Sequence, residues 1–304
     1  MNPLAELRGI VTVLNTPFDE ALEVDLRALR RHVEYALEAD VTGFLVPAMA
    51  SEVTKLSEAE RRDVLRAVLE TVGGTRPVIA GVYADDRESR IRLAKDYVAL
   101  GASALLVSVP FSTAEQLVAD VGEVAEVGPE LVMVQDWSPG GYGIPLDAIE
   151  RLAGEVSAFR SIKIEVAASG IKYSEILDRM RGSLHVAGGW AVTQMIEGLE
   201  RGVHAFMPTA LHEIYVAIYR RFTEGRVESA RDLFNKVLPI LSFSNQHLDV
   251  SIHFFKRLLQ RQGIYGTDGV REPSLPFDRF HRSQADYLTG YAVKLIDDVR
   301  SGRA

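Results

Sequence analysis

The stretch "RSIKIEV", Arg160 to Val166, has the β-branched, apolar character of a buried strand but carries charged residues inside it. Alternate residues of a strand share a face, so Ser161, Lys163 and Glu165 point one way while the two isoleucines and Val166 point the other. The stretch therefore predicts a strand with one apolar face and one face that presents an amine beside a carboxylate.

Seven further short, β-rich apolar runs accompany this strand along the chain. They are "GIVTVLNT" from Gly9, "GFLVP" from Gly43, "PVIAGV" from Pro77, "ALLVSV" from Ala104, "LVMVQ" from Leu131, "LHVAGG" from Leu184 and "AFMPT" from Ala205. Between them lie segments with apolar residues at three- and four-residue intervals, which is the period of an amphipathic helix. Strands that alternate with helices pair in parallel. Eight such units predict a closed (β/α)8 TIM barrel, with a doubly wound open sheet as the alternative.

The C-terminal region has helical periodicity only. Three helices are expected, in the segments from Val227, from His247 and from Phe277, and the loop "IYGTDGVREPSLP" from Ile264 separates the last two. No Ser/Gly-rich linker precedes them. The predicted organisation is a catalytic barrel over residues 1–226 and a helical extension over 227–304 packed on the barrel.

Composition excludes several classes of function. The 304 residues are 47% hydrophobic and 25% charged, as in a globular protein, and the net charge of −8 argues against nucleic acid as a partner. The chain has no cysteine and no apolar run of bilayer length, which together favour a cytoplasmic protein without a membrane partner. The seven histidines show no metal-ligand spacing, and the sequence has no phosphate-binding or dinucleotide fingerprint. We expect no metal and no cofactor.

Lys163 and Glu165 carry the candidate chemistry. In a barrel their face of the strand is the interior, and catalytic residues of this architecture gather at the C-terminal ends of the strands. A neutral lysine amine attacks a ketone to form a Schiff base, which acidifies the neighbouring carbon, and an adjacent carboxylate can then move protons. Desolvation favours the neutral form of the Lys163 amine, whereas a nearby Glu165 anion favours its charged form. The sequence does not decide which of the two effects is larger. A buried ion pair with no catalytic role is the alternative.

Several stretches together resemble one family. They are "GIVTVLNTPFDE" from Gly9, "SEVTKLSEAER" from Ser51, "RPVIAGV" from Arg76, the "SIKIE" around Lys163 and "LQRQGIYGTDGVREPSLP" from Leu259. In this order they are similar to the dihydrodipicolinate synthase / N-acetylneuraminate lyase family of class I, pyruvate-type aldolases. The resemblance covers nearly the whole chain. It implies a TIM barrel, Lys163 as the Schiff-base lysine, a small 2-oxo acid as substrate, and a homodimer or homotetramer.

The chain departs from the family pattern at several positions. The family's Gly-Thr-Thr-Gly-Glu turn is "AMASE" here, so the backbone of Ala50 and Ser51 with the Ser51 hydroxyl is expected to hold the substrate carboxylate. Gln135 stands in place of the proton-relaying tyrosine and is expected to orient the substrate. The second family tyrosine falls near Phe111. In "GGW", which follows "LHVA", the glycines 188 and 189 are expected to let the backbone approach a ligand, or simply to end the strand.

The combination of "VQD", "KIE" and "SE" is similar to the branch of the family that contains 2-keto-3-deoxy-sugar-acid dehydratases. In that interpretation Glu165 replaces the tyrosine as general acid/base, with a pKa raised by desolvation. A pyruvate-dependent aldolase, similar to dihydrodipicolinate synthase or N-acetylneuraminate lyase, is the nearest alternative. A catalytically inactive barrel that binds a keto acid is the alternative outside the enzymes.

Overall fold

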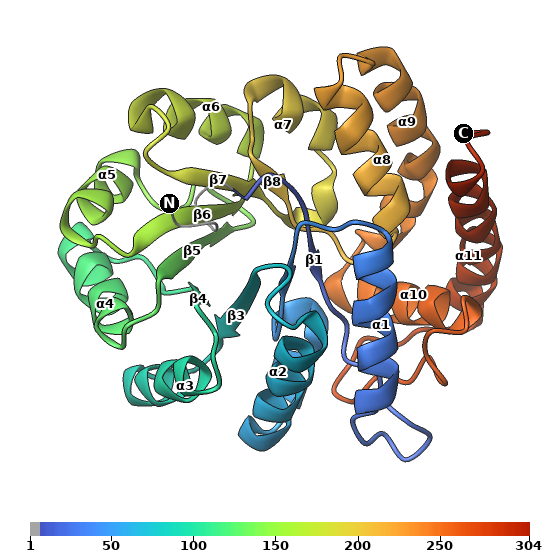
Figure 1. Cartoon of the computed structure of the whole chain (residues 1–304), viewed down its shortest axis with the longest axis horizontal. Helices are drawn as coiled ribbons and strands as arrows, with labels where there is room; N and C mark the ends of the chain where they lie inside the picture. Colours follow the sequence, from blue (N-terminus) through green and yellow to red (C-terminus); the bar gives the residue numbers. More distant parts are fainter. Residues whose placement is uncertain (1–6) are drawn as a thin grey trace. The chain divides into compact units, whose positions relative to one another are not determined.

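The computed structural model describes residues 7–304, in which eight parallel strands close into a barrel in chain order (Figure 1). The predicted TIM barrel is therefore confirmed. The strands are β1 (Gly9–Val13), β2 (Gly43–Leu45), β3 (Val78–Val82), β4 (Ala104–Val107), β5 (Leu131–Ser138), β6 (Phe159–Val166), β7 (His185–Gly188) and β8 (Ala205–Phe206).

Two of the strands end shortly before a proline. The predicted second and eighth strands run to Pro47 and Thr209, but β2 ends at Leu45 and β8 ends at Phe206. Proline has no N–H to give to a neighbouring strand, so Pro47 and Pro208 cannot donate to the strand pairing, although the Pro208 carbonyl still accepts from the Val13 N–H at 2.8 Å.

Contacts within the chain group it into two compact units. The first contains the described residues through Val11, Thr42–Leu45 and Gly74–Met207, and thus nearly all of the barrel strands. Its helices are α3 (Arg87–Ala99), α4 (Ala114–Glu126), α5 (Leu146–Glu155), α6 (Ser169–Met180) and α7 (Met195–Arg201), with one 3-10 turn, η3 (Trp190–Val192). Helices α4 to α6 pack outside β5 to β7, as Figure 1 shows.

The second unit contains Thr12–Val41, Val46–Gly73 and Pro208–Ala304. Its helices are α1 (Leu26–Glu38), α2 (Glu58–Val72), α8 (His212–Thr223), α9 (Val227–Ser244), α10 (Leu248–Arg261) and α11 (Arg279–Arg300), with the 3-10 turns η1 (Met49–Ser51) and η2 (Val53–Lys55). The three predicted C-terminal helices are confirmed as α9, α10 and α11. The division at residue 226 remains a prediction.

The register of β5 and β6 positions the charged face of β6. Gln135 pairs with Lys163, and Trp137 pairs with Glu165, so these four side chains share one face of the two strands. Ile162 and Ile164 are fully buried on the opposite face, which lies towards the helices. The alternation read from "SIKIEV" is thus the alternation of the folded strand.

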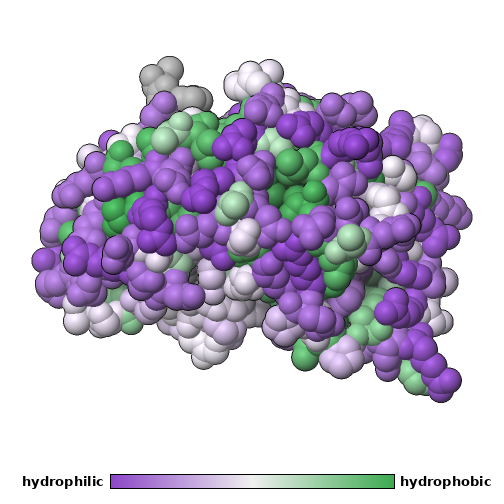
Figure 2. Space-filling view, turned by 90° about the horizontal axis from the view of Figure 1, so that it is seen from below, coloured by the Kyte–Doolittle hydropathy of each residue, from purple (hydrophilic) through white to green (hydrophobic). Residues whose placement is uncertain are grey.

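Hydrophilic residues dominate the molecular face drawn in Figure 2, and hydrophobic residues emerge there in separate patches. Within residues 7–304, no helix combines the length and the apolar character that a bilayer crossing requires.

Candidate active site

Lys163 and Glu165 lie close together on the interior face of β6. Their side chains form an ion pair in which Lys163 Nζ lies 3.0 Å from Glu165 Oε2. Lys163 is 6% exposed and Glu165 is 7% exposed, so both charges are almost removed from solvent. The amine and the carboxylate predicted from the two-residue spacing are therefore neighbours in the folded chain.

Two further donors hold the Glu165 carboxylate. The backbone N–H of Trp190 donates to Oε1 at 2.8 Å, and the Gln135 amide donates to Oε2. Burial by itself would raise the pKa of Glu165, but the Lys163 ammonium, the Trp190 N–H and the Gln135 amide together bring that pKa below its ordinary value. The expectation of a raised pKa is wrong for this arrangement, because three donors outweigh the desolvation.

Gln135 is committed to Glu165 in this structure. Its amide reaches the carboxylate from β5, the strand that pairs with β6 in register. The predicted contact between Gln135 and substrate stays a prediction, and the structure adds a second role in which Gln135 orients Glu165.

Two glycines at the end of β7 lie on opposite sides of the strand. A Cβ on Gly189 would fall on the Glu165 carboxyl group, 2.5 Å from Cδ, so only glycine leaves room for the carboxylate there. A Cβ on Gly188 would instead meet Tyr173 and Phe206, at 2.9 and 3.0 Å. Their predicted contact with a ligand stays a prediction, but Gly189 is already required by Glu165.

Ala50 and Ser51 belong to the second unit, in the turn η1. The Ser51 hydroxyl donates to the Leu14 carbonyl at 2.6 Å, and the Ser51 N–H donates to the Ala48 carbonyl at 2.8 Å. The Ala50 carbonyl accepts from the Asn15 amide at 2.7 Å. Both donors of Ser51 are thus engaged by backbone carbonyls, one within the turn region and one after β1. The predicted binding of a substrate carboxylate by Ala50 and Ser51 stays a prediction.

A second buried ion pair lies on the outer face of β5. Asp136 pairs with Lys172 of α6, and both side chains are 1% exposed. Lys172 also donates to the carbonyls of Tyr142 and Ile144, at 2.6 and 2.7 Å, while Asp136 accepts from the Ile144 N–H at 2.9 Å. The pair therefore pins the loop that follows β5. Sequence reasoning missed it, because the outer face of a barrel strand is expected to be apolar.

Two tryptophans at the same end of the strands were also missed. Trp137 stacks on Trp190, with ring centroids 5.0 Å apart and an interplanar angle of 23°. Trp137 follows Gln135 by two residues, and this period-two spacing was the available signal that it shares a face with Lys163 and Glu165.

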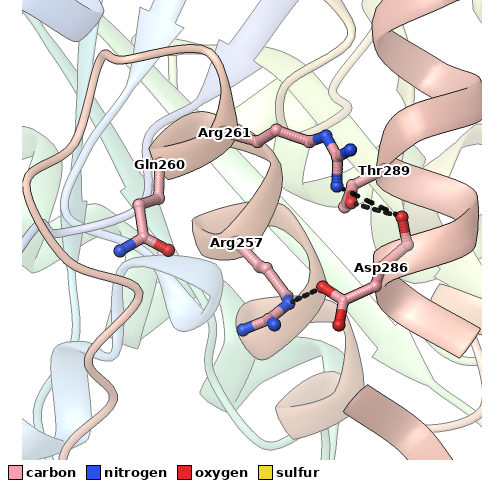
Figure 3. Close-up of a pocket in the computed structure, with 5 residues that line it drawn as sticks. All are labelled: Arg257, Gln260, Arg261, Asp286 and Thr289. Carbon is pink, nitrogen blue, oxygen red and sulfur yellow. Dashed lines mark hydrogen bonds and ion pairs between the residues drawn. The ribbon is translucent and has the colours of Figure 1, made fainter. Parts of the chain in front are cut away.

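Two features outside this site concern metal binding and a cavity. In the described part of the chain, no group of three or more His, Cys, Asp or Glu side chains is arranged to hold a metal ion. A cavity of about 240 Å³ between α10 and α11 is lined by Arg257, Gln260, Arg261, Asp286 and Thr289 (Figure 3). There Arg257 pairs with Asp286 at 2.6 Å and Arg261 donates to the Asp286 carbonyl at 3.3 Å, so the charged groups satisfy one another.

Sequence comparison identifies the family. The profile of the Dihydrodipicolinate synthetase family matches residues 6–289. The chain belongs to this family. It is therefore a lyase of the class that works through a lysine Schiff base, as the resemblance implied.

Members of the family with different reactions match the chain over most of its length. A 4-hydroxy-tetrahydrodipicolinate synthase of Xanthomonas campestris pv. campestris is 31% identical over 95% of this chain and 96% of its own. An L-2-keto-3-deoxyarabonate dehydratase of Azospirillum brasilense is 26% identical over 88% of each chain. The crystal structure of a dihydrodipicolinate synthase from Rhodopseudomonas palustris superposes with a TM-score of 0.85 at 21% identity, over 94% of this chain and 98% of that one. The relatives of this chain thus include both a synthase and a dehydratase.

Proposed function

We propose that the chain is a hydro-lyase that dehydrates a 2-keto-3-deoxy sugar acid, with Lys163 as the nucleophile and Glu165 as the general acid/base. The observation that carries this proposal is the Glu165 carboxylate 3.0 Å from Lys163 Nζ, on the same face of β6. A relative named L-2-keto-3-deoxyarabonate dehydratase supports it.

The reaction begins with imine formation. The Lys163 ammonium first gives up a proton, the neutral amine attacks the C2 carbonyl of the 2-oxo acid, and the proton returns to the departing oxygen. Loss of one water then leaves a protonated imine that draws electrons from C3. Glu165 is held ionised by its three donors and so starts as a base. It removes a proton from C3, which converts the imine to a neutral enamine.

The enamine then expels the hydroxyl group at C4. Its nitrogen carries no charge, so it no longer lowers the pKa of Glu165, while burial still raises that pKa and favours the protonated carboxyl. The protonated Glu165 donates to the departing hydroxyl, and water leaves. Hydrolysis of the resulting unsaturated imine frees the product and restores the lysine. One carboxyl group thus serves both proton transfers.

The residue type at position 135 supports dehydration over aldol cleavage. Cleavage requires a base at the C4 hydroxyl, which the resemblance assigns to a family tyrosine, and Gln135 stands at that position. An amide does not take up a proton at neutral pH. A pyruvate-dependent aldolase remains the alternative, and a barrel that binds a keto acid without turnover is the alternative outside the enzymes.

The test is to incubate the protein with five- and six-carbon 2-keto-3-deoxy acids and to identify products by mass spectrometry. A product lighter by one water supports the proposal, whereas pyruvate plus an aldehyde would establish the aldolase. Borohydride treatment with pyruvate should add a reduced adduct to the peptide that contains Lys163. An adduct on another peptide, or one that persists in Lys163→Ala, contradicts the assignment of the nucleophile. A homodimer or homotetramer and a cytoplasmic location remain predictions.

A further inference from the structure

Trp137 of β5 and Trp190 of the turn η3 both lie next to Glu165. Trp137 is the partner of Glu165 in the β5–β6 register, so its side chain leaves the sheet on the same face as the carboxylate. Trp190 follows β7 and donates its backbone N–H to Glu165 Oε1 at 2.8 Å. The stacked indoles thus adjoin Glu165 through the register position of Trp137 and the backbone of Trp190.

The tryptophan pair combines a strained backbone at Trp190 with an exposed side chain at Trp137. Trp190 has a φ of +54°, in the left-handed region that non-glycine residues rarely occupy, and such strain is concentrated at functional sites. Trp137 remains 54% exposed although it is one of the largest apolar side chains. No hydrogen bond joins either indole N–H to another residue in the described part of the chain. An open π-face and two available donors thus lie beside the catalytic carboxylate.

We infer that Trp137 and Trp190 form a platform that binds the carbon chain of the substrate beyond C4 and selects 2-keto-3-deoxy acids of five or more carbons. This inference rests on the proposed function. The imine fixes C2 at Lys163 and Glu165 addresses C3, so C5 and C6 extend past Glu165 towards the stacked indoles. A hydroxylated chain suits them, because its C–H edges pack on an indole face and its hydroxyl oxygens accept from the indole N–H groups.

The test compares substrates that differ only beyond C4. A four-carbon acid, 2-keto-4-hydroxybutanoate, has the C3 protons and C4 hydroxyl that the reaction needs but nothing that reaches the platform. The wild-type ratio of kcat/KM for a six-carbon acid over this four-carbon acid should exceed one. Trp137→Ala should lower the ratio about tenfold, and Trp137→Phe should restore at least half of the loss on a logarithmic scale.

A matched control removes an exposed aromatic side chain elsewhere. Tyr287 on α11 is 69% exposed, and Tyr287→Ala should leave the ratio unchanged. An unchanged ratio in Trp137→Ala overturns the platform, and so does an equal loss on both substrates, since that would mean a general defect. Pyruvate trapping at Lys163 in the wild-type protein tests the proposed function separately, because pyruvate ends at C3.

Tryptophan fluorescence gives a second readout that does not depend on turnover. The chain contains only two tryptophans, so the whole signal comes from this pair. In Lys163→Ala, which cannot form the imine, a six-carbon 2-keto-3-deoxy acid should change the fluorescence at a lower concentration than pyruvate does. Equal responses to the two ligands, or no response to the six-carbon acid, would contradict the platform.

Discussion

Replacing the Glu165 carboxylate with an amide separates imine formation from proton transfer. In Glu165→Gln the side chain keeps its shape, and its oxygen can still accept from the Trp190 N–H. The amide nitrogen then faces Lys163 and Gln135, which both donate to Oε2 in the native protein. Gln135 can rotate its amide to present oxygen instead. The variant is therefore expected to fold and to retain the nucleophile.

The expected loss is in turnover. One positioned acid/base contributes roughly 10²–10⁴-fold to the rate. At 1.36 kcal/mol per tenfold, this corresponds to about 3–5 kcal/mol of stabilisation of the transition state. Glu165→Gln should therefore lose at least about 100-fold in kcat for dehydration. Borohydride trapping of pyruvate at Lys163 should persist, because attack on the carbonyl requires the amine and not the carboxylate. Glu165→Asp keeps the carboxyl group but shortens the side chain by one methylene, so its kcat should lie between those of the native protein and Glu165→Gln.

The assay measures the dehydrated product by mass spectrometry and the trapped adduct by peptide mapping. Glu150 on α5 provides a matched control, since its exposed carboxylate pairs with Arg179 at 3.1 Å, and Glu150→Gln should turn over at the native rate. If Glu165→Gln keeps activity within tenfold of the native protein, the acid/base assignment is refuted. If the variant folds but no longer traps pyruvate, Glu165 acts on the lysine rather than on C3.

Three further outcomes follow from the structure. Condensation of pyruvate with aspartate semialdehyde should be slower than in ordinary synthases by roughly 10²-fold or more, because the resemblance places Gln135 where the family has its proton-relaying tyrosine. A coupled assay with comparable turnover contradicts this. Gly189→Ala should displace Glu165 and cost about 100-fold in kcat, while trapping at Lys163 persists. Burial lowers the pKa values of His185 and His212 to about 4, so the unfolded chain takes up protons between pH 6.5 and pH 4 that the folded chain does not. The free energy of unfolding should therefore fall across that window by up to about 3 kcal/mol per histidine, and His212→Gln should show a shallower fall in urea titrations at pH 7 and pH 4.5.

The fold could be predicted because it depends on periods that each segment carries by itself. The two-residue period of "SIKIEV" and the three- and four-residue periods of the intervening segments determine which side chains are buried, and burial is what drives strands and helices to form. Prolines set the ends of β2 and β8, again a local property of the chain. For the same reason the sequence could place Lys163 and Glu165 on one face.

The environment of Glu165 was decided by tertiary structure alone. Its donors come from Gln135 on β5 and from Trp190 after β7, which lie 30 and 25 residues away in the chain. Only the pairing of β5, β6 and β7 brings them to one carboxylate, and their combined charge and dipoles reverse the pKa shift that desolvation alone would give. The sequence thus determined which groups are available and on which face they stand. The register between strands decided their partners and their protonation, because electrostatic energy depends on distances in space and not on separation along the chain.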